Sequence, residues 1–389
     1  MNQIAPAGLG RLPADHYEAA KNISHPDAIL LRSYDMHAME IPASVKAIGR
    51  AGAGTNNIPV DKMSARGVPV FNAPGANANA VKELVLAGLL IAARNLVPAI
   101  RYVDSLDRKA VDLEAKIEDG KKQFAGSELP GKTLGIIGLG AIGSLVADTA
   151  IKLGMKVIGF DPHITVDSAW RLPSSVKKAD SVEAVLKQSD FVSLHVPLLD
   201  TTRRLINSQR LAFMKPEAAL LNFSRDGIID VDAVLTALTD KKLRYYISDF
   251  PGEKSIGHTG VVALPHLGAS TAEAEENCAI MVVDQVREFL EHGTITNAVN
   301  FPNVEMERES PYRVVIANAN VPNMVGQIST AMANGKLNIH NMINKSRGDM
   351  AYTLVDVDSP ISGELVQRIA SITGVLSVRA IPLKDEAKR

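Results

Sequence analysis

Hydrophobic and polar positions alternate with two different periods between residues 27 and 265. Short apolar or β-branched runs with the length of strands include AILLRS, VPVFNAP, TLGIIG, FVSLHVP and VVALPH. Between them lie amphipathic stretches with helical spacing, such as NAVKELVLAGLLIAARN and IGSLVADTAIKLG. Strands separated by helices predict right-handed crossovers and mostly parallel sheets. The pattern therefore predicts a doubly wound α/β protein.

A glycine-rich segment begins only at Gly138, so another α/β unit precedes it. A charged stretch, SLDRKAVDLEAKIEDGKKQFAGSELPGK, separates the two units. After residue 271 a helical pattern is long enough to pack back on the first unit. We therefore predict a discontinuous first domain of residues 1–97 and 269–300, which brackets a second domain of residues 98–268.

The pattern changes at residue 312 to strand, helix, strand, strand, helix, strand. This order is typical of a small ferredoxin-like domain. We predict a linker at residues 301–311 and this domain at residues 312–389, where no residue forms a catalytic pattern. The predicted fold class is two doubly wound Rossmann-like domains, one of them discontinuous, and a C-terminal ferredoxin-like domain that senses a ligand or assists assembly.

Composition and charge exclude several classes of function. Among 389 residues, 42 basic and 43 acidic side chains leave a net charge of -1, which favours neither nucleic acid nor an anionic membrane as partner. The most apolar stretch is interrupted by Arg94 before it reaches the roughly 20 residues of a membrane span. No secretory signal pattern opens the chain, and the single cysteine, Cys278, excludes an intramolecular disulfide. We expect a cytoplasmic protein without a metal site.

The segment KTLGIIGLGAIGSLVADTAIKLGMKVIGFDP carries a dinucleotide-binding pattern after an apolar strand and before a helix. Its glycines permit a tight turn, close approach of a pyrophosphate and close packing of helix on sheet, and the phosphates would contact amides at the helix start. The residues predicted to bind the cofactor here are Gly138, Gly140, Ala141, Ile142 and Gly143.

Asp161 ends the next strand, where a carboxylate binds both ribose hydroxyls and repels a 2′-phosphate. The segment therefore predicts NAD rather than NADP. The alternative is that the glycines serve only a turn and that Asp161 caps a strand. The order of strand, helix and acidic residue favours the cofactor, which makes the second domain an NAD-binding Rossmann domain.

Three side chains border strand ends in the second domain and suit the oxidation of a hydroxyacid. Arg225 follows an apolar strand, and its guanidinium can bind a carboxylate through two parallel hydrogen bonds. His266 follows a later strand and can accept a hydroxyl proton near neutral pH. Glu253 would orient the imidazole and stabilise its charged form. Taken singly, the three also fit a surface cation, a polar cap and a loop charge.

Several motifs in order resemble the D-isomer-specific 2-hydroxyacid dehydrogenases: GLGAIG with Asp161, SLHVPL, NFSRDGIID and PHLGAST. Upstream, IGRAGAGTNNIPVDKMSARGVPVFNAPGANANAVKELV resembles most closely the branch of D-3-phosphoglycerate dehydrogenases. The C-terminal unit resembles the ACT domain that many of that branch carry. The resemblance covers nearly the whole chain from Ala28.

The resemblance implies that Arg225 orients the substrate, that Glu253 supports the histidine and that His266 exchanges the proton. It adds cofactor contacts from Phe223, Ser224, Arg225, His266 and Gly268. Many relatives have an aspartate at the position of Ser248 that contacts the nicotinamide amide, and we expect Asp249 to take this role here.

For the phosphate end of the substrate, the resemblance points to Arg50 and Asn77 in the first domain, with Lys82 as a helper. In the ACT-like unit, Asn320 and Asn338 match asparagines that bind serine in related regulatory domains. Asn323 stands where such domains usually have glycine, so the segment departs from the serine-binding pattern at this position. Family members are commonly homo-oligomers, so we expect one here.

The leading hypothesis is NAD-dependent oxidation of 3-phospho-D-glycerate to 3-phosphohydroxypyruvate, the first step of the phosphorylated pathway of L-serine biosynthesis. A glyoxylate or hydroxypyruvate reductase would use the same three side chains without needing Arg50. A third hypothesis is an NAD-sensing regulator that has kept the fold and lost the reaction. The presence of Arg225, Glu253 and His266 argues against this regulator.

Overall fold

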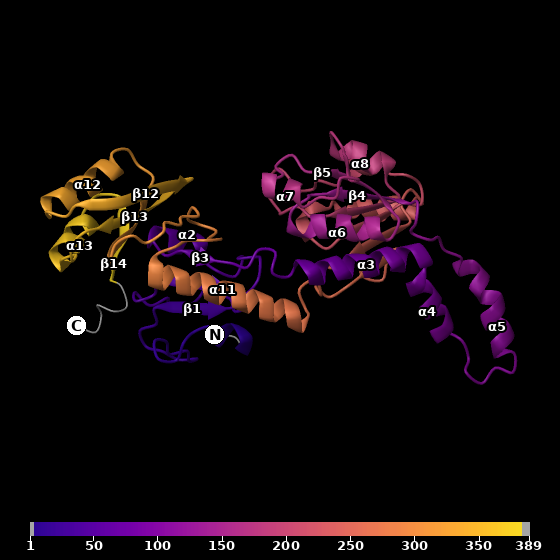
Figure 1. Cartoon of the computed structure of the whole chain (residues 1–389). Helices are drawn as coiled ribbons and strands as arrows, with labels where there is room; N and C mark the ends of the chain where they lie inside the picture. Colours follow the sequence, from indigo (N-terminus) through magenta and orange to yellow (C-terminus); the bar gives the residue numbers. More distant parts are fainter. Residues whose placement is uncertain (1–3, 383–389) are drawn as a thin grey trace. The chain divides into compact units, whose positions relative to one another are not determined.

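The structure of the protein, a computed structural model, describes residues 4–382. The chain divides into two compact units (Figure 1). Unit 1 combines residues 1–77 with residues 272–389, and unit 2 comprises residues 78–271. Each unit contains its own sheets and its own buried clusters, so each is described by itself.

Unit 2 is built on a seven-stranded sheet in the order β10-β9-β8-β7-β4-β5-β6, and every pair of neighbouring strands is parallel. The chain runs outward through β4, β5 and β6 and then returns to β7 beside β4. This is the doubly wound order predicted from the sequence. The strands are β4 (Thr133–Ile137), β5 (Lys156–Phe160), β6 (Lys177–Lys178), β7 (Phe191–Leu194), β8 (Ala219–Asn222), β9 (Tyr245–Ser248) and β10 (Val261–Ala263).

Helices cover both faces of this sheet, with α6 and α8 on opposite sides (Figure 1). One apolar cluster joins the sheet to α3 and α6, and the other joins it to α8, α9 and α10. The helices of unit 2 are α3 (Ala78–Arg94), α4 (Leu96–Asp104), α5 (Leu113–Gly120), η1 (Lys121–Phe124), α6 (Ala141–Lys152), α7 (Val166–Trp170), α8 (Val182–Gln188), α9 (Ser208–Leu211), η2 (Asp226–Ile228) and α10 (Val231–Thr239).

Helix α3 lies in unit 2, although the sequence placed residues 78–97 in the first domain. Its buried face joins the cluster formed with α6 and the sheet. Gly88 permits the close approach, because a Cβ atom there would come within 2.9 Å of Leu221 and 3.1 Å of Phe223. The amphipathic pattern of α3 predicts a buried face, but it does not say which sheet that face meets.

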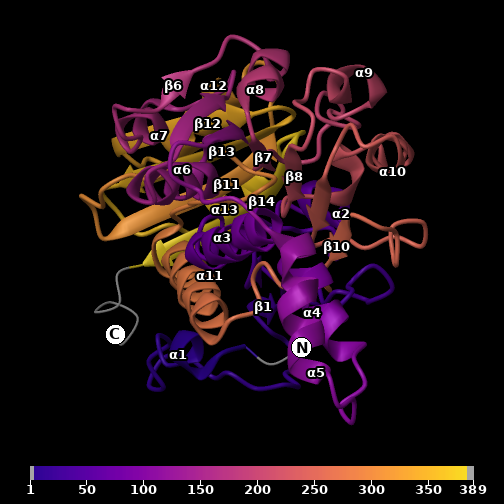
Figure 2. The ribbon, with the colours of Figure 1, turned by 90° about the vertical axis from the view of Figure 1, so that its right-hand side faces the viewer.

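Helices α4 and α5 follow α3 and run beside one another as a helical hairpin (Figures 1 and 2). The hydroxyl of Tyr102 on α4 donates to the carbonyl oxygen of Lys116 on α5 at 2.7 Å. Leu96, Ile100 and Val103 share a face of α4 and remain exposed. No single helix in the described part of the chain is long and apolar enough to cross a membrane, although α3 and α4, bent by 68°, meet that test together.

The first part of unit 1 is a three-stranded parallel sheet in the order β1-β2-β3, on which the 21-residue helix α11 packs. Met36, Ile48 and Met63 are fully buried in its core. The elements are α1 (Pro6–Leu9), β1 (Ala28–Leu31), β2 (Ala47–Arg50), α2 (Val60–Ala65), β3 (Val70–Phe71) and α11 (Ala272–His292).

The second part of unit 1 is an antiparallel sheet in the order β12-β13-β11-β14, which fits the predicted ferredoxin-like fold. Its helices both pack on one face through a shared apolar cluster. The opposite face packs on Phe289 and Phe301. The elements are β11 (Tyr312–Ala319), α12 (Met324–Asn334), β12 (Ile339–Arg347), β13 (Met350–Val357), α13 (Gly363–Ala370) and β14 (Val375–Pro382).

Candidate active site

The glycine loop connects β4 to α6 and is shaped by close backbone contacts. Gly138 has a φ of +93°, in the region that favours glycine, and a Cβ atom there would come within 2.5 Å of the carbonyl oxygen of His195. A Cβ atom on Gly143 would overlap the carbonyl oxygen of Gly138. A Cβ atom on Gly140 would meet no atom within 4 Å. The first and third glycines are therefore required by packing, whereas the second faces open space.

The start of α6 offers backbone amides to that space. Gly140 is the N-cap residue, and no side chain caps the helix. The amide of Ser144 donates to the carbonyl of Gly140 at 3.0 Å, so the amides of Ala141, Ile142 and Gly143 have no intrahelical acceptor. Open space, uncapped amides and the positive end of a 12-residue helix fit a diphosphate group.

Asp161 follows β5 and lies beside the glycine loop. One carboxylate oxygen accepts from the amide of Leu139 and the other from the amide of His163, both at 2.9 Å. A carboxylate can accept about four hydrogen bonds, so acceptor positions remain for ribose hydroxyls. The residues present at the ends of β4 and β5 therefore fit a dinucleotide with unmodified ribose.

His195 follows β7, next to β4, and sequence reasoning missed it. Its amide donates to the carbonyl of Ile137 at 2.7 Å, and its Nε2 lies 2.9 Å from Oγ of Ser193. Burial of the ring lowers the pKa of His195 to about 4, although part of the residue remains accessible to solvent. The available signal was a histidine directly after an apolar strand, at the point where the strand order reverses.

Arg225 follows β8 at the same edge of the sheet and is exposed. The side chain of the fully buried Asn222 shapes this turn, because it donates to the carbonyl of Arg225 at 2.9 Å and accepts from the amide of Ser224 at 3.2 Å. The guanidinium donates to the carbonyl of Ser224 at 2.7 Å. Among the described residues no acidic side chain pairs with Arg225, so its fork is available to an anion.

Two further residues predicted to contact the cofactor follow β8. The hydroxyl of Ser224 donates to the carbonyl of Val196. Phe223 is 5% exposed and packs in the core beside α3. The ring of Phe223 therefore belongs to the core, and a cofactor contact by either residue stays a prediction.

His266 lies on the loop after β10 and is exposed. Its φ of +56° is left-handed, which is uncommon outside glycine. Its ring packs on Phe250, with 4.9 Å between ring centroids. Asp249 accepts hydrogen bonds from the amides of Leu267 and Gly268. We expected Asp249 to contact the nicotinamide amide, whereas the structure directs its carboxylate to the main chain of this loop.

Glu253 lies on the exposed loop after β9, and its predicted contact with His266 is not formed in this structure. No hydrogen bond or ion pair joins the two within residues 4–382. The loop is fixed by Ser255, whose hydroxyl accepts from the amide of Gly252 at 2.9 Å, and by an ion pair of Lys254 with Asp232 at 2.7 Å. These contacts leave Glu253 in solvent.

The residues predicted to bind the substrate phosphate fall in both units. Arg50 ends β2 in unit 1, and its Nε donates to the carbonyl of Arg32 at 3.1 Å. Asn77 is the last residue before unit 2. Lys82 belongs to α3 of unit 2 and donates to Oδ1 of Asn79 at 2.5 Å. Their binding of substrate stays a prediction.

The two asparagines predicted to bind an amino acid lie at opposite ends of the C-terminal sheet. Asn320 follows the end of β11 that pairs with Met350, whereas Asn338 precedes the end of β12 that pairs with Val357. Asn320 donates to the carbonyl of Gly348 at 3.0 Å. One copy of the chain therefore does not bring the two side chains together.

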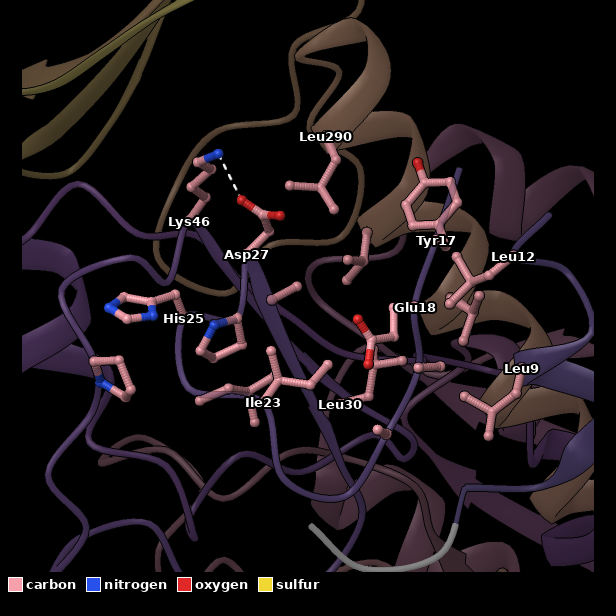
Figure 3. A pocket seen from close by; sticks show the side chains of 18 of the residues that line it. Leu9, Leu12, Tyr17, Glu18, Ile23, His25, Asp27, Leu30, Lys46 and Leu290 are labelled. Atoms are coloured by element: carbon pink, nitrogen blue, oxygen red, sulfur yellow. Dashed lines mark hydrogen bonds and ion pairs between the residues drawn. The ribbon is translucent and has the colours of Figure 1, made fainter. Parts of the chain in front are cut away.

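A cavity of about 1240 Å³ in unit 1 contains none of the predicted site residues (Figure 3). It lies between the N-terminal segment, β1 and α11. Some of its polar side chains already have partners: Lys46 pairs with Asp27 at 2.6 Å, and the hydroxyl of Tyr17 donates to Glu291 at 2.8 Å. The part of the chain that the structure describes also contains no cluster of three potential metal ligands.

The lowered pKa of His195 predicts a pH-dependent stability. Between about pH 4 and 6.5 the unfolded chain binds a proton at this position and the folded chain does not, so acid favours unfolding. The free energy of unfolding should fall by up to about 3 kcal/mol as the pH drops from 7 to 4, and His195→Asn should remove that part. Urea unfolding at several pH values measures this free energy, with the exposed His163→Asn as control. If the free energy of unfolding of His195→Asn fell with pH as steeply as that of the wild type, the assignment would be contradicted.

Residues 87–268 match the family model described as D-isomer specific 2-hydroxyacid dehydrogenase, NAD binding domain. The matched segment contains the glycine loop, Asp161 and the three side chains predicted for chemistry. The family model agrees with the fit of the glycine loop, and the cofactor is NAD.

Curated relatives named D-3-phosphoglycerate dehydrogenase are similar over most of the chain. The protein from Methanocaldococcus jannaschii is 34% identical over 87% of this chain, and the protein from Haemophilus influenzae is 33% identical over 88%. The chain spans 63% of the length of the former and 83% of the latter.

Solved structures share the fold. An NAD⁺-bound 3-phosphoglycerate dehydrogenase from Entamoeba histolytica has a TM-score of 0.54 at 26% identity, covering 70% of this chain and 82% of that one. The apo D-mandelate dehydrogenase from Rhodotorula graminis has a TM-score of 0.59 at 27% identity, covering 67% and 79%. The chain belongs to the family of D-isomer specific 2-hydroxyacid dehydrogenases.

Proposed function

We propose that the protein is an NAD-dependent dehydrogenase that oxidises 3-phospho-D-glycerate to 3-phosphohydroxypyruvate, the first step of the phosphorylated pathway of L-serine biosynthesis. The proposal rests on the groups that follow successive strands along one edge of the sheet of unit 2. The NAD-binding loop follows β4, Arg225 follows β8 and His266 follows β10. The curated relatives of that name, at 31 to 34% identity, support this substrate.

The chemistry divides between a hydride and a proton. NAD, held by the glycine loop and Asp161, would supply the acceptor for the hydride of C2 of the hydroxyacid. The imidazole of His266 accepts the proton of the 2-hydroxyl, and the guanidinium of Arg225 holds the carboxylate so that C2 is correctly oriented. We assign Glu253 to stabilise the protonated imidazole of His266. Because Glu253 is exposed in this structure, the loop fixed by Ser255 must move to bring its carboxylate to the imidazole.

Arg50 and Asn77 are proposed to bind the phosphate of the substrate. Arg50 is at the carboxyl end of a parallel strand, where open α/β sheets bind ligands. A guanidinium recognises phosphate through two parallel hydrogen bonds. The requirement for Arg50 is what separates this substrate from unphosphorylated hydroxyacids.

A second candidate is reduction of glyoxylate or hydroxypyruvate. The solved glyoxylate reductase from Paecilomyes thermophila has a TM-score of 0.58 to this chain at 28% identity, covering 70% of this chain and 83% of that one. The same Arg225 and His266 would serve that reaction in reverse, since both substrates carry a carboxylate beside the reacting carbon. Turnover on phosphorylated and unphosphorylated acids distinguishes the two candidates.

Assembly and regulation complete the proposal. The exposed face of α4 formed by Leu96, Ile100 and Val103 supports a homo-oligomer. Asn320 and Asn338, at opposite ends of the C-terminal sheet, would meet on one serine molecule only if they came from two copies of the chain. The single buried Cys278 is consistent with a cytoplasmic enzyme.

The substrate is tested by NADH absorbance with 3-phosphoglycerate, glycerate and lactate, each with and without serine. We expect the phosphorylated acid to give the highest kcat/KM. A preference for an unphosphorylated acid would support the reductase instead. No NADH formation with any hydroxyacid would leave the NAD-sensing regulator as the better explanation.

His266→Ala should lower kcat by at least about 100-fold, because removal of a general acid-base costs about 10² to 10⁴ in rate. The variant should still bind NADH, and the fluorescence of NADH measures this binding directly. His258→Ala is the matched control, because His258 lies on the loop between β9 and β10. Its Nδ1 lies 2.7 Å from the carbonyl oxygen of Thr259. Near-normal turnover in His266→Ala would reject the role.

Arg50→Ala should raise KM for 3-phosphoglycerate by roughly 10-fold or more with a smaller change in kcat, since the lost contact binds ground state and transition state alike. Arg66→Ala, which removes another arginine of unit 1 that donates to two carbonyls, controls for general damage to that unit. An unchanged KM in Arg50→Ala would move the phosphate site elsewhere.

A further inference from the structure

We propose that Asp249 is a positioning residue for His266, an inference that rests on the proposed function of that histidine. Its carboxylate holds the two main-chain amides that follow His266 and so fixes where the imidazole stands. This differs from a direct contact between Asp249 and the nicotinamide amide. It also differs from a role in stability alone.

The hydrogen bonds are short and use both carboxylate oxygens. Oδ1 of Asp249 accepts from the amide of Leu267 at 2.6 Å, and Oδ2 accepts from the amide of Gly268 at 2.7 Å. Such charge-assisted bonds to backbone amides are stronger and shorter than bonds between neutral groups. The fit is tight, because a Cβ atom on Gly268 would lie 3.1 Å from Oδ2.

Burial commits this carboxylate to the loop. Asp249 is only 1% exposed, and no arginine, lysine or histidine forms an ion pair with it among residues 4–382. A buried carboxylate without a cation depends on its hydrogen-bond donors, and here the two amides are those donors. Breaking either bond would leave a buried acceptor without its partner, so the loop and Asp249 hold one another in place.

The conformation of His266 is one that needs such support. The left-handed region is unfavourable for residues other than glycine, and His266 has a φ of +56°. The side-chain direction at that residue depends on this φ, because an extended backbone would turn the imidazole elsewhere. The amide of Leu267 belongs to the peptide plane that directly follows His266, and the amide of Gly268 belongs to the next plane, so the two bonds to Asp249 fix the backbone on the C-terminal side of the histidine.

The neighbours of Asp249 complete the arrangement. Phe250 packs its ring on the imidazole at 4.9 Å, and the carbonyl of Ser248 accepts from the amide of Leu264 at 2.8 Å. The hydroxyl of Ser248 accepts from the amide of Phe250 at 3.1 Å. Ser248 at the end of β9 and the two residues after it thus contact the loop before, at and after His266. Asp249 is the only one of the three that binds main-chain groups following the histidine.

Asp249→Asn tests the proposal, because it keeps the shape of the side chain. It replaces one acceptor oxygen by an NH₂ donor, which would face the amide of Leu267 or Gly268. We expect kcat for 3-phosphoglycerate to fall about 10-fold, as for a small misplacement of a catalytic group, with KM and the affinity for NADH changed less than about 2-fold. In a His266→Ala background the same substitution should change kcat less than about 2-fold, because Asp249 acts through the imidazole. Asp240→Asn, an exposed carboxylate paired with Lys242, is the control.

The outcomes separate the proposals. An equal loss from Asp249→Asn in both backgrounds overturns the positioning role and leaves the proposed function intact. Weaker NADH binding as the main effect also overturns it, in favour of direct contact with the nicotinamide. Normal turnover of His266→Ala overturns the proposed function, and the positioning role with it.

Hydrogen exchange of the protein without cofactor gives a readout independent of activity. The amides of Leu267 and Gly268 lie next to an exposed histidine, and we expect them to exchange at least about 10-fold more slowly than unprotected amides. Asp249→Asn should remove this protection while the rest of unit 2 stays protected. If that variant does not fold, the wild-type measurement decides, because unprotected amides at both positions would overturn the proposal.

Discussion

The parallel direction of seven neighbouring strands is the constraint on which the site depends. Because all strands of unit 2 point the same way, every segment that follows a strand emerges at the same edge of the sheet. The glycine loop, His195, Arg225 and Asp249 each follow a strand of this sheet, and β4, β7, β8 and β9 are consecutive neighbours. Residues far apart in sequence therefore gather without any long loop to position them.

The sequence predicted the parts of this site that are encoded locally. The spacing of Gly138, Gly140 and Gly143 after a strand indicated the turn. In the structure, close backbone contacts require glycine at Gly138 and Gly143, and Gly140 faces open space. Alternation of strands and helices predicted the parallel order, and the change of pattern at residue 312 predicted the antiparallel sheet. These features follow from backbone geometry, which short sequence patterns determine directly.

Features that depend on the direction of side chains were not predictable in the same way. No pattern indicates that the carboxylate of Asp249 turns to the main chain after His266, or that Glu253 remains in solvent. The assignment of α3 to unit 2 depends on the match between its apolar face and a particular sheet. The low pKa of His195 follows from enclosure by neighbouring segments.

The contacts at the end of α11 have a mechanical consequence for unit 1. Arg313 donates to the carbonyl of His292, and Arg379 donates to the carbonyl of Phe289. The hydroxyl of Tyr352 donates to the carbonyl of Gly293, so the C-terminal sheet binds the last turn of the helix at two points and the residue after it at a third. The same helix packs along β2, the strand that ends at Arg50. A ligand that displaced the C-terminal sheet would therefore shift the end of α11. Because α11 packs on β2, that shift would be transmitted to Arg50 at the end of β2.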